Sequence, residues 1–315
     1  LILIEFCEES GSPDLPHYMN LYADIINAPD LVICLDSGAG DYRRFWTTTS
    51  LRGLIGATLK VEVLTEGVHS GGASGHVPSS FRIARQLLSR IENEKTGEIL
   101  LDELKTEIPD YRLKETEEFV SVLGDEVVEE FPWKETMEPS SSDNVEGVLR
   151  RTWRPALSVV GADGLPPSAN AGNVLRPFTQ LQLSMRIPPM VDPIKAQEAM
   201  RKALTENPPY NAKVTLHFEE GASGWNAPET KPWLSKAMNK YSKIFFKEPS
   251  GSLCEGGTIP FMAMLGEQFP KAQFVITGVL GPGSNAHGPN EFLHIPYAKK
   301  LTACVASILS DFRAD

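Results

Sequence analysis

The sequence lacks the features that mark several classes of protein. It has no block of lysine or arginine and carries a net charge of −11 at pH 7, so nucleic acids and anionic membranes are poor partners. No apolar run approaches the length of a transmembrane helix. The four cysteines lie far apart and form no Cys-x-x-Cys pair, which argues against a zinc ribbon or a disulfide framework. Such cysteine usage fits a reducing compartment, and we expect a cytoplasmic protein.

What is present is the composition of an ordinary globular protein. The chain has 315 residues, of which 41% are hydrophobic and 23% are charged. This length is sufficient for two domains.

The start of the chain carries the first candidate for chemistry. Residues 1–4, Leu-Ile-Leu-Ile, have the length and branching of a buried strand, and Glu8-Glu9-Ser10-Gly11-Ser12 follows them. Adjacent carboxylates repel each other, so they persist together where a cation lies beside them or where one is protonated. One of them could bind a metal while the other handles protons. The alternative for the Glu pair taken alone is a solvated acidic turn.

A second strand end adds another carboxylate. Residues 13–28 have helical spacing, residues 31–35 are apolar, and Asp36-Ser37-Gly38 follows. Strand, helix and strand over this length predict a βαβ unit of a parallel sheet. The two strand ends of such a unit lie at the same edge, so Glu9 and Asp36 are expected to converge. An ordinary turn aspartate is the alternative for Asp36.

A glycine-rich loop at residues 68–76 contains His69 and leads into an amphipathic helix at residues 79–92. Such a loop suits an anion or a developing oxyanion, because backbone N–H groups point outward at a helix start. It is not a Walker loop, since the Gly-Lys-Ser/Thr ending is absent. A structural or surface role is the alternative for His69.

The middle of the chain predicts an α+β insert. Residues 94–147 are acidic and helical in pattern, and we interpret them as a solvated helical face. Residues 178–187 alternate between apolar and polar side chains, as a strand does. Arg186, near the end of this strand, could clamp a carboxylate through its guanidinium, and an exposed strand arginine is the alternative. A helix with an Asp-Pro start follows at residues 192–205.

After Gly224 the α/β pattern returns. Residues 253–260 predict a strand end that turns into a helix, and residues 274–279 predict a strand. A long glycine-rich loop after that strand carries His287. Together with Glu9 and Asp36, His287 completes a set of oxygen and nitrogen donors that suits zinc, manganese or cobalt.

Taken together, these residues resemble the metallopeptidase family that contains carnosine dipeptidase, aminoacylase-1, glutamate carboxypeptidase and succinyl-diaminopimelate desuccinylase. The matching stretches occur in the family's order and cover the chain nearly end to end, and the long insert is most similar to the dipeptidase branch. They are Glu8-Glu9-Ser10-Gly11-Ser12, Asp36 after its strand, Val68-His69-Ser70-Gly71-Gly72, Ser184-Met185-Arg186-Ile187-Pro188, Cys254-Glu255-Gly256-Gly257-Thr258-Ile259-Pro260 and Ala286-His287-Gly288-Pro289-Asn290-Glu291.

The resemblance implies an α/β catalytic domain, with a mainly parallel sheet flanked by helices, formed by residues 1–46 and 226–315. An inserted α+β lid and dimerisation domain at residues 47–225 interrupts it. The implied reaction is hydrolysis of a peptide or amide bond in a dipeptide or small peptide by a water that two divalent metal ions activate, with zinc first and manganese or cobalt as alternatives. The implied assembly is a homodimer, formed through the insert.

The resemblance also implies a role for each matching residue. Glu8 looks like the general base, and Glu9, Asp36 and His287 look like metal ligands. His69 resembles the histidine that reaches into the partner's site of a dimer and stabilises the oxyanion. The residues that resemble the substrate-binding elements are Arg186, Asn173, Gly256, Gly257 and Thr258.

One departure from the family pattern limits these implications. The family's His-x-Asp motif and its bridging Asp precede the Glu pair, and this sequence contains no His-x-Asp. Three of the five expected ligands are therefore present, and we expect a segment of about a hundred residues before Leu1 to supply the others. Two alternative functions stay open: an N-acyl-amino-acid deacylase or desuccinylase of the same family, and a non-catalytic relative or fragment without a complete metal site.

Overall fold

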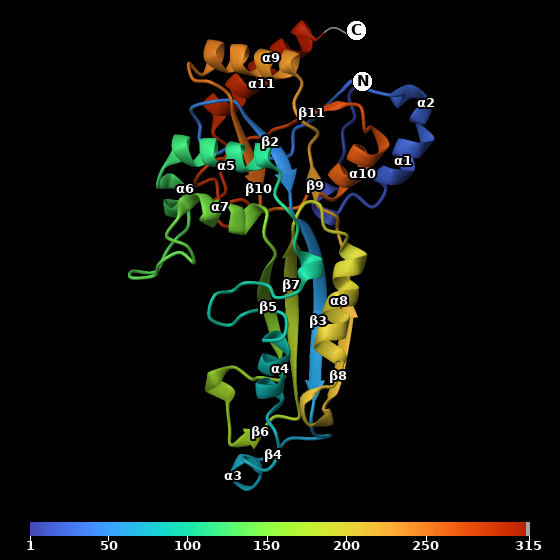
Figure 1. Ribbon diagram of the computed structural model, residues 1–315, viewed down its shortest axis with the longest axis vertical. Coiled ribbons are helices and arrows are strands. Elements are labelled where there is room, and N and C mark those ends of the chain that lie inside the picture. Colours follow the sequence, from blue (N-terminus) through green and yellow to red (C-terminus); the bar gives the residue numbers. More distant parts are fainter. Residues whose placement is uncertain (313–315) are drawn as a thin grey trace. The chain divides into compact units, whose positions relative to one another are not determined.

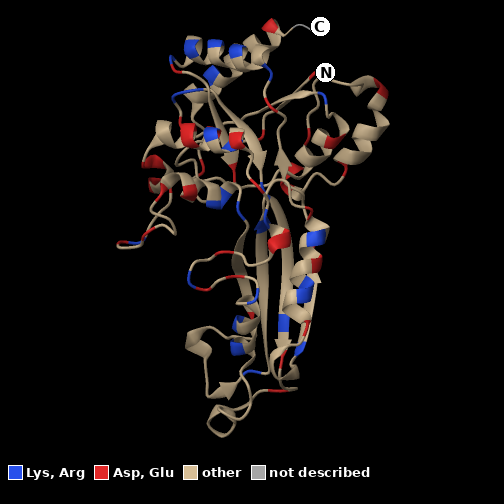
Figure 2. Cartoon of the chain, viewed as in Figure 1, with Lys and Arg blue, Asp and Glu red and all other residues tan. Residues whose placement is uncertain are grey.

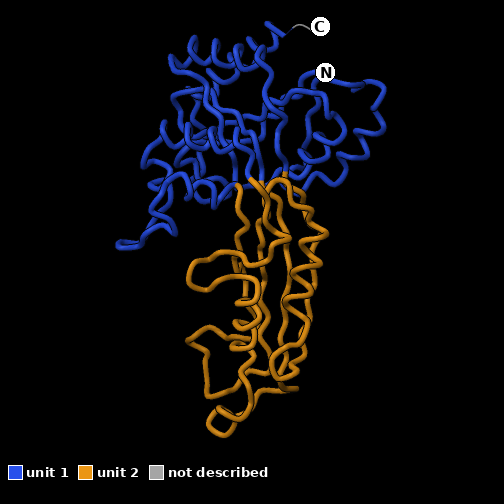
Figure 3. The backbone as a smooth tube through the Cα atoms, in the orientation of Figure 1, with its two compact units in different colours: residues 1–51, 108–152, 225–315 blue, residues 52–107, 153–224 orange. Residues whose placement is uncertain are grey.

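The computed structural model describes residues 1–312 of the chain. The chain divides into two compact units, which Figure 3 shows in different colours. Unit 1 is built from residues 1–51, residues 108–152 and the residues from 225 onward; unit 2 is built from residues 52–107 and 153–224. The sequence predicted a continuous insert at 47–225. The structure differs, because the middle segment, residues 108–152, packs in unit 1.

Unit 1 combines a sheet with helices (Figure 1). Its elements are the 3-10 helix η1 (Glu8–Ser10), the helices α1 (Leu15–Leu21), α2 (Ala23–Ile26), α5 (Asp110–Leu123), α6 (Glu126–Glu129), α7 (Asn144–Thr152), α9 (Pro232–Phe245), α10 (Pro260–Gln268) and α11 (Ile295–Asp311), and the strands β1 (Leu31–Cys34), β2 (Trp46–Leu51), β9 (Trp225–Asn226), β10 (Gly251–Glu255) and β11 (Gln273–Ile276).

The sheet of unit 1 has the order β1-β11-β2-β10, and β9 pairs with β2. Its longer ladders, β1 with β11 and β2 with β10, are parallel. Alternation along β11 separates two cores: Phe274 and Ile276 pack in a cluster that includes side chains of α1 and α10, whereas Val275 packs with α9 and α11. Helices therefore cover both faces of a mainly parallel sheet, which confirms the predicted α/β class.

The strand predicted at residues 1–4 is wrong. These residues form no strand, and their apolar side chains are exposed, from 49% for Leu3 to 87% for Ile2. A strand needs a neighbour that satisfies its backbone N–H and C=O groups. In the described part of the chain β1 pairs with β11 alone, and residues 1–4 pair with no strand. The Glu8-Glu9 pair accordingly lies in the short helix η1 rather than at the end of a strand.

The packing of the helical segment from α5 to α7 differs from a second expectation. We interpreted residues 94–147 as a solvated face, but Phe119, Leu123 and Val127 are buried against Trp46 of β2 and Leu253 of β10. The interior positions follow the helical spacing of four residues, so one face of the segment is apolar. This packing places the segment beside the sheet of unit 1.

Unit 2 is an α+β layer structure, as predicted for the insert (Figure 1). Its elements are the strands β3 (Gly53–Glu62), β4 (Val68–His69), β5 (Ala156–Asp163), β6 (Val174–Leu175), β7 (Phe178–Ile187) and β8 (Lys213–Phe218), the helices α3 (Ser70–Ala73), α4 (Ser80–Leu88) and α8 (Pro193–Thr205), and the 3-10 helices η2 (Asp102–Leu104), η3 (Ser168–Asn170) and η4 (Pro209–Asn211).

The four-stranded sheet of unit 2 is antiparallel, in the order β5-β7-β3-β8. The alternation predicted for residues 178–187 is confirmed, because buried and half-buried positions alternate along β7. The apolar faces of β3 and β7 pack with α4 and α8 in one core. Asp192 caps α8 by accepting hydrogen bonds from the N–H groups of Ile194 and Lys195, and Pro193 occupies the first helical turn.

No helix among residues 1–312 combines the length and the apolar character needed to cross a lipid bilayer.

The two buried cysteines of unit 1 give a direct test of its packing. Burial raises the pKa of the Cys34 and Cys304 thiols to about 12, whereas Cys7 is exposed. At pH 8 a thiol with a pKa of about 12 is ionised at roughly one part in ten thousand, and the thiolate is the reactive form. We expect alkylation of Cys34 and Cys304 at pH 8 to be at least about tenfold slower than alkylation of Cys7. Peptide mass spectrometry over time measures this, and urea should remove the difference. Equal rates in the native protein would contradict the packing.

Candidate functional site

Loops from four strands meet at one place in unit 1. The loop after β1 contains Asp36, Ser37 and Gly38. The Ser37 and Thr48 hydroxyl groups are hydrogen-bonded at 2.5 Å, which ties this loop to β2. The Gly38 N–H donates to Glu255 Oε1 at 3.0 Å, which ties it to the end of β10. The Ala39 N–H donates to the Leu280 carbonyl at 2.7 Å, which ties it to the loop after β11.

An acidic cluster lies beside this junction. The carboxyl groups of Glu8 and Asp36 share a hydrogen bond, which raises the pKa of Glu8 and lowers that of Asp36. Burial is the largest cause of the raised pKa of Glu8, and the charges of Asp36 and Glu9 raise it further. Partial burial is also the main reason that the pKa of Asp36 is raised overall, with Glu9 and Glu5 adding to the effect.

His287 reaches the same cluster from the loop after β11. Its Nδ1 lies 3.7 Å from Glu9 Oε2, and both side chains are about three-quarters exposed. The backbone of His287 has a φ of +58°, which a non-glycine residue adopts infrequently. The expected convergence of Glu9, Asp36 and His287 thus has structural support through two links, Glu9 with His287 and Glu8 with Asp36.

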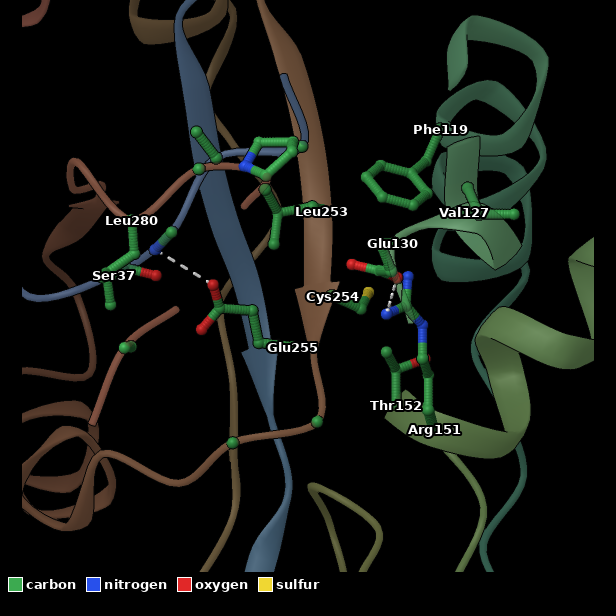
Figure 4. A pocket seen from close by; sticks show the side chains of 18 of the residues that line it. Ser37, Phe119, Val127, Glu130, Arg151, Thr152, Leu253, Cys254, Glu255 and Leu280 are labelled. Carbon is green, nitrogen blue, oxygen red and sulfur yellow. Dashed lines mark hydrogen bonds and ion pairs between the residues drawn. The ribbon is translucent and has the colours of Figure 1, made fainter. Parts of the chain in front are cut away.

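These residues line a cavity of about 890 Å³, a volume within the usual range for small-molecule sites. Seven of the residues singled out from the sequence belong to its lining: Glu8, Glu9, Asp36, Gly256, Gly257, Thr258 and His287. The helical segment α5 to α7 supplies another part of the lining. Figure 4 shows Phe119, Val127 and the Arg151–Glu130 ion pair on the side of the cavity opposite Ser37 and Glu255.

The cavity is strongly acidic. Its lining carries the carboxyl groups of Glu8, Glu9, Asp36, Glu126, Glu129, Glu130 and Glu255. Arg151 is the one Lys or Arg among the described residues that line it, and it is paired with Glu130. Figure 2 shows, in red, Asp and Glu residues along α5 to α7. Such a lining favours cations, whether metal ions or protonated amines.

The donors in the cavity fit a divalent cation chemically. Carboxylates and an imidazole are ligands of zinc, manganese and cobalt, and Glu9, Asp36 and His287 are the residues that would hold such an ion. Burial is the main cause of the raised pKa values of Glu8 and Asp36, and the neighbouring carboxylates add to it; a cation would relieve their mutual repulsion. Among residues 1–312, however, no group of three or more His, Cys, Asp or Glu side chains is arranged to hold a metal ion. The ligand set therefore stays a prediction.

Two of the residues singled out in unit 2 are neighbours. His69 ends β4 and pairs with Val174 of β6, and the Ser70 N–H donates to the Asn173 carbonyl at 2.9 Å. The His69 imidazole lies over Gly71, where an added Cβ would be 2.7 Å from its Cε1. His69 and Asn173 are both exposed, so both can reach a ligand.

Arg186 lies on the inner strand β7, opposite Leu54 of β3 and Ala156 of β5. It is half-buried, and burial lowers the pKa of its guanidinium. The alternative of an exposed strand arginine is therefore wrong.

Sequence reasoning missed two parts of the cavity. Glu255 belongs to a stretch that was singled out, but no role was given to it; burial raises its pKa, while hydrogen bonds from Gly38 and Ser37 lower it. The Arg151–Glu130 pair was missed because the segment around it was interpreted as solvated. The four-residue spacing of Phe119, Leu123 and Val127 was the signal that could have identified this wall of the cavity.

Comparisons with known proteins match most of the chain. The peptidase dimerisation domain model of the M20 family matches residues 49–211, which is about half of the chain. A cysteinylglycine-S-conjugate dipeptidase from Corynebacterium striatum is 26% identical over 314 residues, covering 95% of this chain and 65% of that protein. The present chain thus spans 65% of the length of this curated relative.

Two solved structures share the fold. The dipeptidase Dug1p from Saccharomyces cerevisiae superimposes with a TM-score of 0.76 at 20% identity, covering 98% of this chain and 65% of that one. Human carnosine dipeptidase 1 gives a TM-score of 0.73 at 16% identity, covering 97% and 64%.

Proposed function

The chain belongs to the M20 metallopeptidase family, in its dipeptidase branch, and on that premise we propose that the full-length protein hydrolyses the peptide bond of dipeptides or small peptides. The observation that carries this proposal is an acidic cavity, in which Glu8, Glu9, Asp36 and His287 meet the turn at residues 256–258. The dipeptidase named above supports the substrate class, because it aligns with 95% of this chain.

The proposed mechanism assigns separate tasks to the two glutamates. Glu9, Asp36 and His287 would hold divalent metal, two ions in the complete site, with zinc first. When bound, such ions lower the pKa of water and so provide a nucleophile at neutral pH. Glu8 accepts the proton of the attacking water and returns it to the leaving amine. The contact of Glu8 with Asp36 supports this role, because it puts the carboxyl group of Glu8 next to a proposed metal ligand.

Other residues bind the substrate in this proposal. Arg186, with Gly256, Gly257 and Thr258, holds its carboxylate, and Asn173 is a polar residue that contacts the substrate. His69 stabilises the oxyanion in the partner's site of a homodimer formed through the dimerisation domain, whose family model matches residues 49–211. Sedimentation of the full-length protein tests the dimer, because a monomer at assay concentration would exclude a histidine that acts across subunits.

The charge of the cavity favours dipeptides over N-acyl amino acids. A dipeptide has a protonated amine, which an acidic lining attracts, whereas an acetyl group is neutral and a succinyl group carries a further negative charge. Comparing kcat/KM for simple dipeptides with kcat/KM for acetyl- and succinyl-amino acids distinguishes a dipeptidase from an N-acyl-amino-acid deacylase. Higher values for the acylated substrates would favour the deacylase. Metal analysis of the full-length protein distinguishes these two enzymes from a non-catalytic relative. Such a relative would bind no ion even after divalent metal is added.

Arg186 provides a test of substrate binding. We expect Arg186→Met to raise the KM for a dipeptide about 10- to 100-fold with little change in kcat, because a hydrogen-bonded charge contact of about 1.5–3 kcal/mol is lost in the ground state and transition state alike. Arg82→Met is the matched control, since Arg82 is exposed in the same unit and lies over Tyr210. A dipeptide amide, which has no free carboxylate, should be equally poor for Arg186→Met and wild type. An unchanged KM for the free dipeptide would exclude the clamp.

The cytoplasmic location is part of the proposal. All four cysteines are free thiols, as is usual in a reducing compartment. Fractionation of the producing cells tests this, and recovery of the protein outside the cytoplasm would contradict it.

A further inference from the structure

We propose that Glu255 is a positioning residue that fixes the loop carrying Asp36 against the turn at residues 256–258. This inference rests on the proposed function, because it takes Asp36 as a metal-binding carboxylate and the turn as a substrate-binding element. Glu255 is the last residue of β10 and directly precedes that turn. Its side chain reaches the loop that begins after β1, 217 residues earlier in the chain.

The order of strands in the sheet explains why such a link is needed. β1 and β10 are not neighbours, since β11 and β2 lie between them. No ladder hydrogen bond therefore joins β1 directly to β10. The bond from the Gly38 N–H to Glu255 Oε1, at 3.0 Å, connects these two ends directly; it is the dashed line that ends on Glu255 in Figure 4.

Gly38 shows how closely the loop is held. A Cβ added at Gly38 would lie 2.7 Å from Glu255 Oε1 and 3.0 Å from the Leu280 carbonyl. The 2.7 Å separation is shorter than real Cβ atoms show, so an alanine at this position would displace the carboxylate of Glu255. The restriction is one of space, because Gly38 does not have a positive φ. A methyl group at Gly38 would therefore break the bond to Glu255 and crowd the Leu280 carbonyl.

The carboxylate of Glu255 accepts hydrogen bonds from more than one donor. It accepts from the Gly38 N–H and is also hydrogen-bonded to Ser37. Ser37 is in turn bonded to Thr48 of β2. A carboxylate has two acceptor oxygens and makes stronger, charge-assisted bonds, whereas a glutamine keeps only one acceptor oxygen. The loop therefore depends on Glu255 for two successive residues that directly follow Asp36.

The consequence is a specific expectation for metal binding. Groups that orient a metal ligand typically contribute about 10- to 100-fold to metal affinity. In the full-length protein freed of metal, we expect Glu255→Ala to weaken zinc binding by about this factor, and Glu255→Gln to weaken it several-fold less. Gly38→Ala should reproduce the loss seen with Glu255→Ala, because it breaks the same contact from the other side. The double variant should be no weaker than either single variant.

The experiment is a competition titration with zinc and a chromophoric chelator, run well below the Tm of every variant. Glu267→Ala is the control, since Glu267 is an exposed glutamate on α10 in the same unit. Hydrogen exchange at the Gly38 amide gives a second readout, and it should accelerate in Glu255→Ala but not in Glu267→Ala.

Asp36→Asn distinguishes failure of this inference from failure of the proposed function. If Asp36→Asn loses zinc while Glu255→Ala binds it normally, Glu255 does not position the loop. If Glu255→Ala and Gly38→Ala weaken binding additively, they do not act through one contact and the inference is also wrong. If Asp36→Asn itself binds zinc normally, the metal site proposed under the function is wrong.

Discussion

Replacing Glu8 by Gln in the full-length protein is expected to lower kcat by about 100- to 10,000-fold, the usual contribution of a general base. Glutamine has nearly the same shape as glutamate but cannot accept the proton of the attacking water. Because Glu9, Asp36 and His287 remain, zinc content should stay at the wild-type level. Steady-state kinetics on a simple dipeptide, with metal analysis of the same sample, measures both quantities.

The position of Glu8 makes this test selective. Glu8 and Glu9 are adjacent, but Glu8 bonds to Asp36 whereas Glu9 faces His287. We therefore expect Glu9→Gln to lose zinc together with activity, and Glu8→Gln to lose activity alone. Glu267→Gln on the exposed face of α10 should change neither quantity. Turnover near wild type in Glu8→Gln would mean that another group moves the proton.

Replacing Arg112 by Met is expected to destabilise unit 1 by about 3–5 kcal/mol, the range for breaking a buried charged network from one side. The Arg112 side chain is 2% exposed and bonds to three partners. It donates to Glu115 Oε2 at 2.5 Å, to Asn226 Oδ1 at 2.9 Å and to the Ala227 carbonyl at 2.8 Å. These bonds join α5 to the region of β9, so their loss would free the helical wall of the cavity.

The measurement is urea denaturation, with unfolding monitored by circular dichroism and by tryptophan fluorescence. Lys114→Met is the matched control, because Lys114 is an exposed cation two residues further along α5, and it should stay within about 0.5 kcal/mol of wild type. Agreement of Arg112→Met with wild type to within about 1 kcal/mol would show that the network contributes little to the stability of unit 1.

The parts of the fold that follow from local patterns could be predicted from the sequence. Residues 178–187 alternate strictly, and they form the inner strand β7 with one buried face. The Asp192-Pro193 start predicted α8, and the structure has that cap. In these cases the periodicity and the capping chemistry are properties of a few consecutive residues, so no distant partner is needed to recognise them.

The parts that depend on distant partners could not be predicted in this way. The apolar run at residues 1–4 has strand propensity, but propensity does not supply a neighbouring strand. The packing of residues 108–152 in unit 1 depends on β10, which lies more than a hundred residues further along the chain. The contact between Gly38 and Glu255 spans 217 residues, and neither residue type reveals it.

The residues of the candidate site show the same difference between local patterns, which can be predicted, and distant contacts, which cannot. The carboxylates and the imidazole were identified because they follow apolar strands in glycine-containing loops. Their proximity was inferred from a βαβ unit whose first strand is not formed, so part of that reasoning was wrong although Glu8 and Glu9 do lie beside Asp36. Arg151 and Glu255 were missed because their roles arise from the cavity and not from a motif.

The division into units also sets the order in which they can be completed during synthesis. Unit 2 ends at Gly224, so all of its strands are synthesised before β10 and β11. Domains fold as units while the chain emerges. Unit 2 can therefore fold before β10 and β11 are available, whereas β1, β2 and the helical segment α5 to α7 cannot complete their sheet until those two strands have been made.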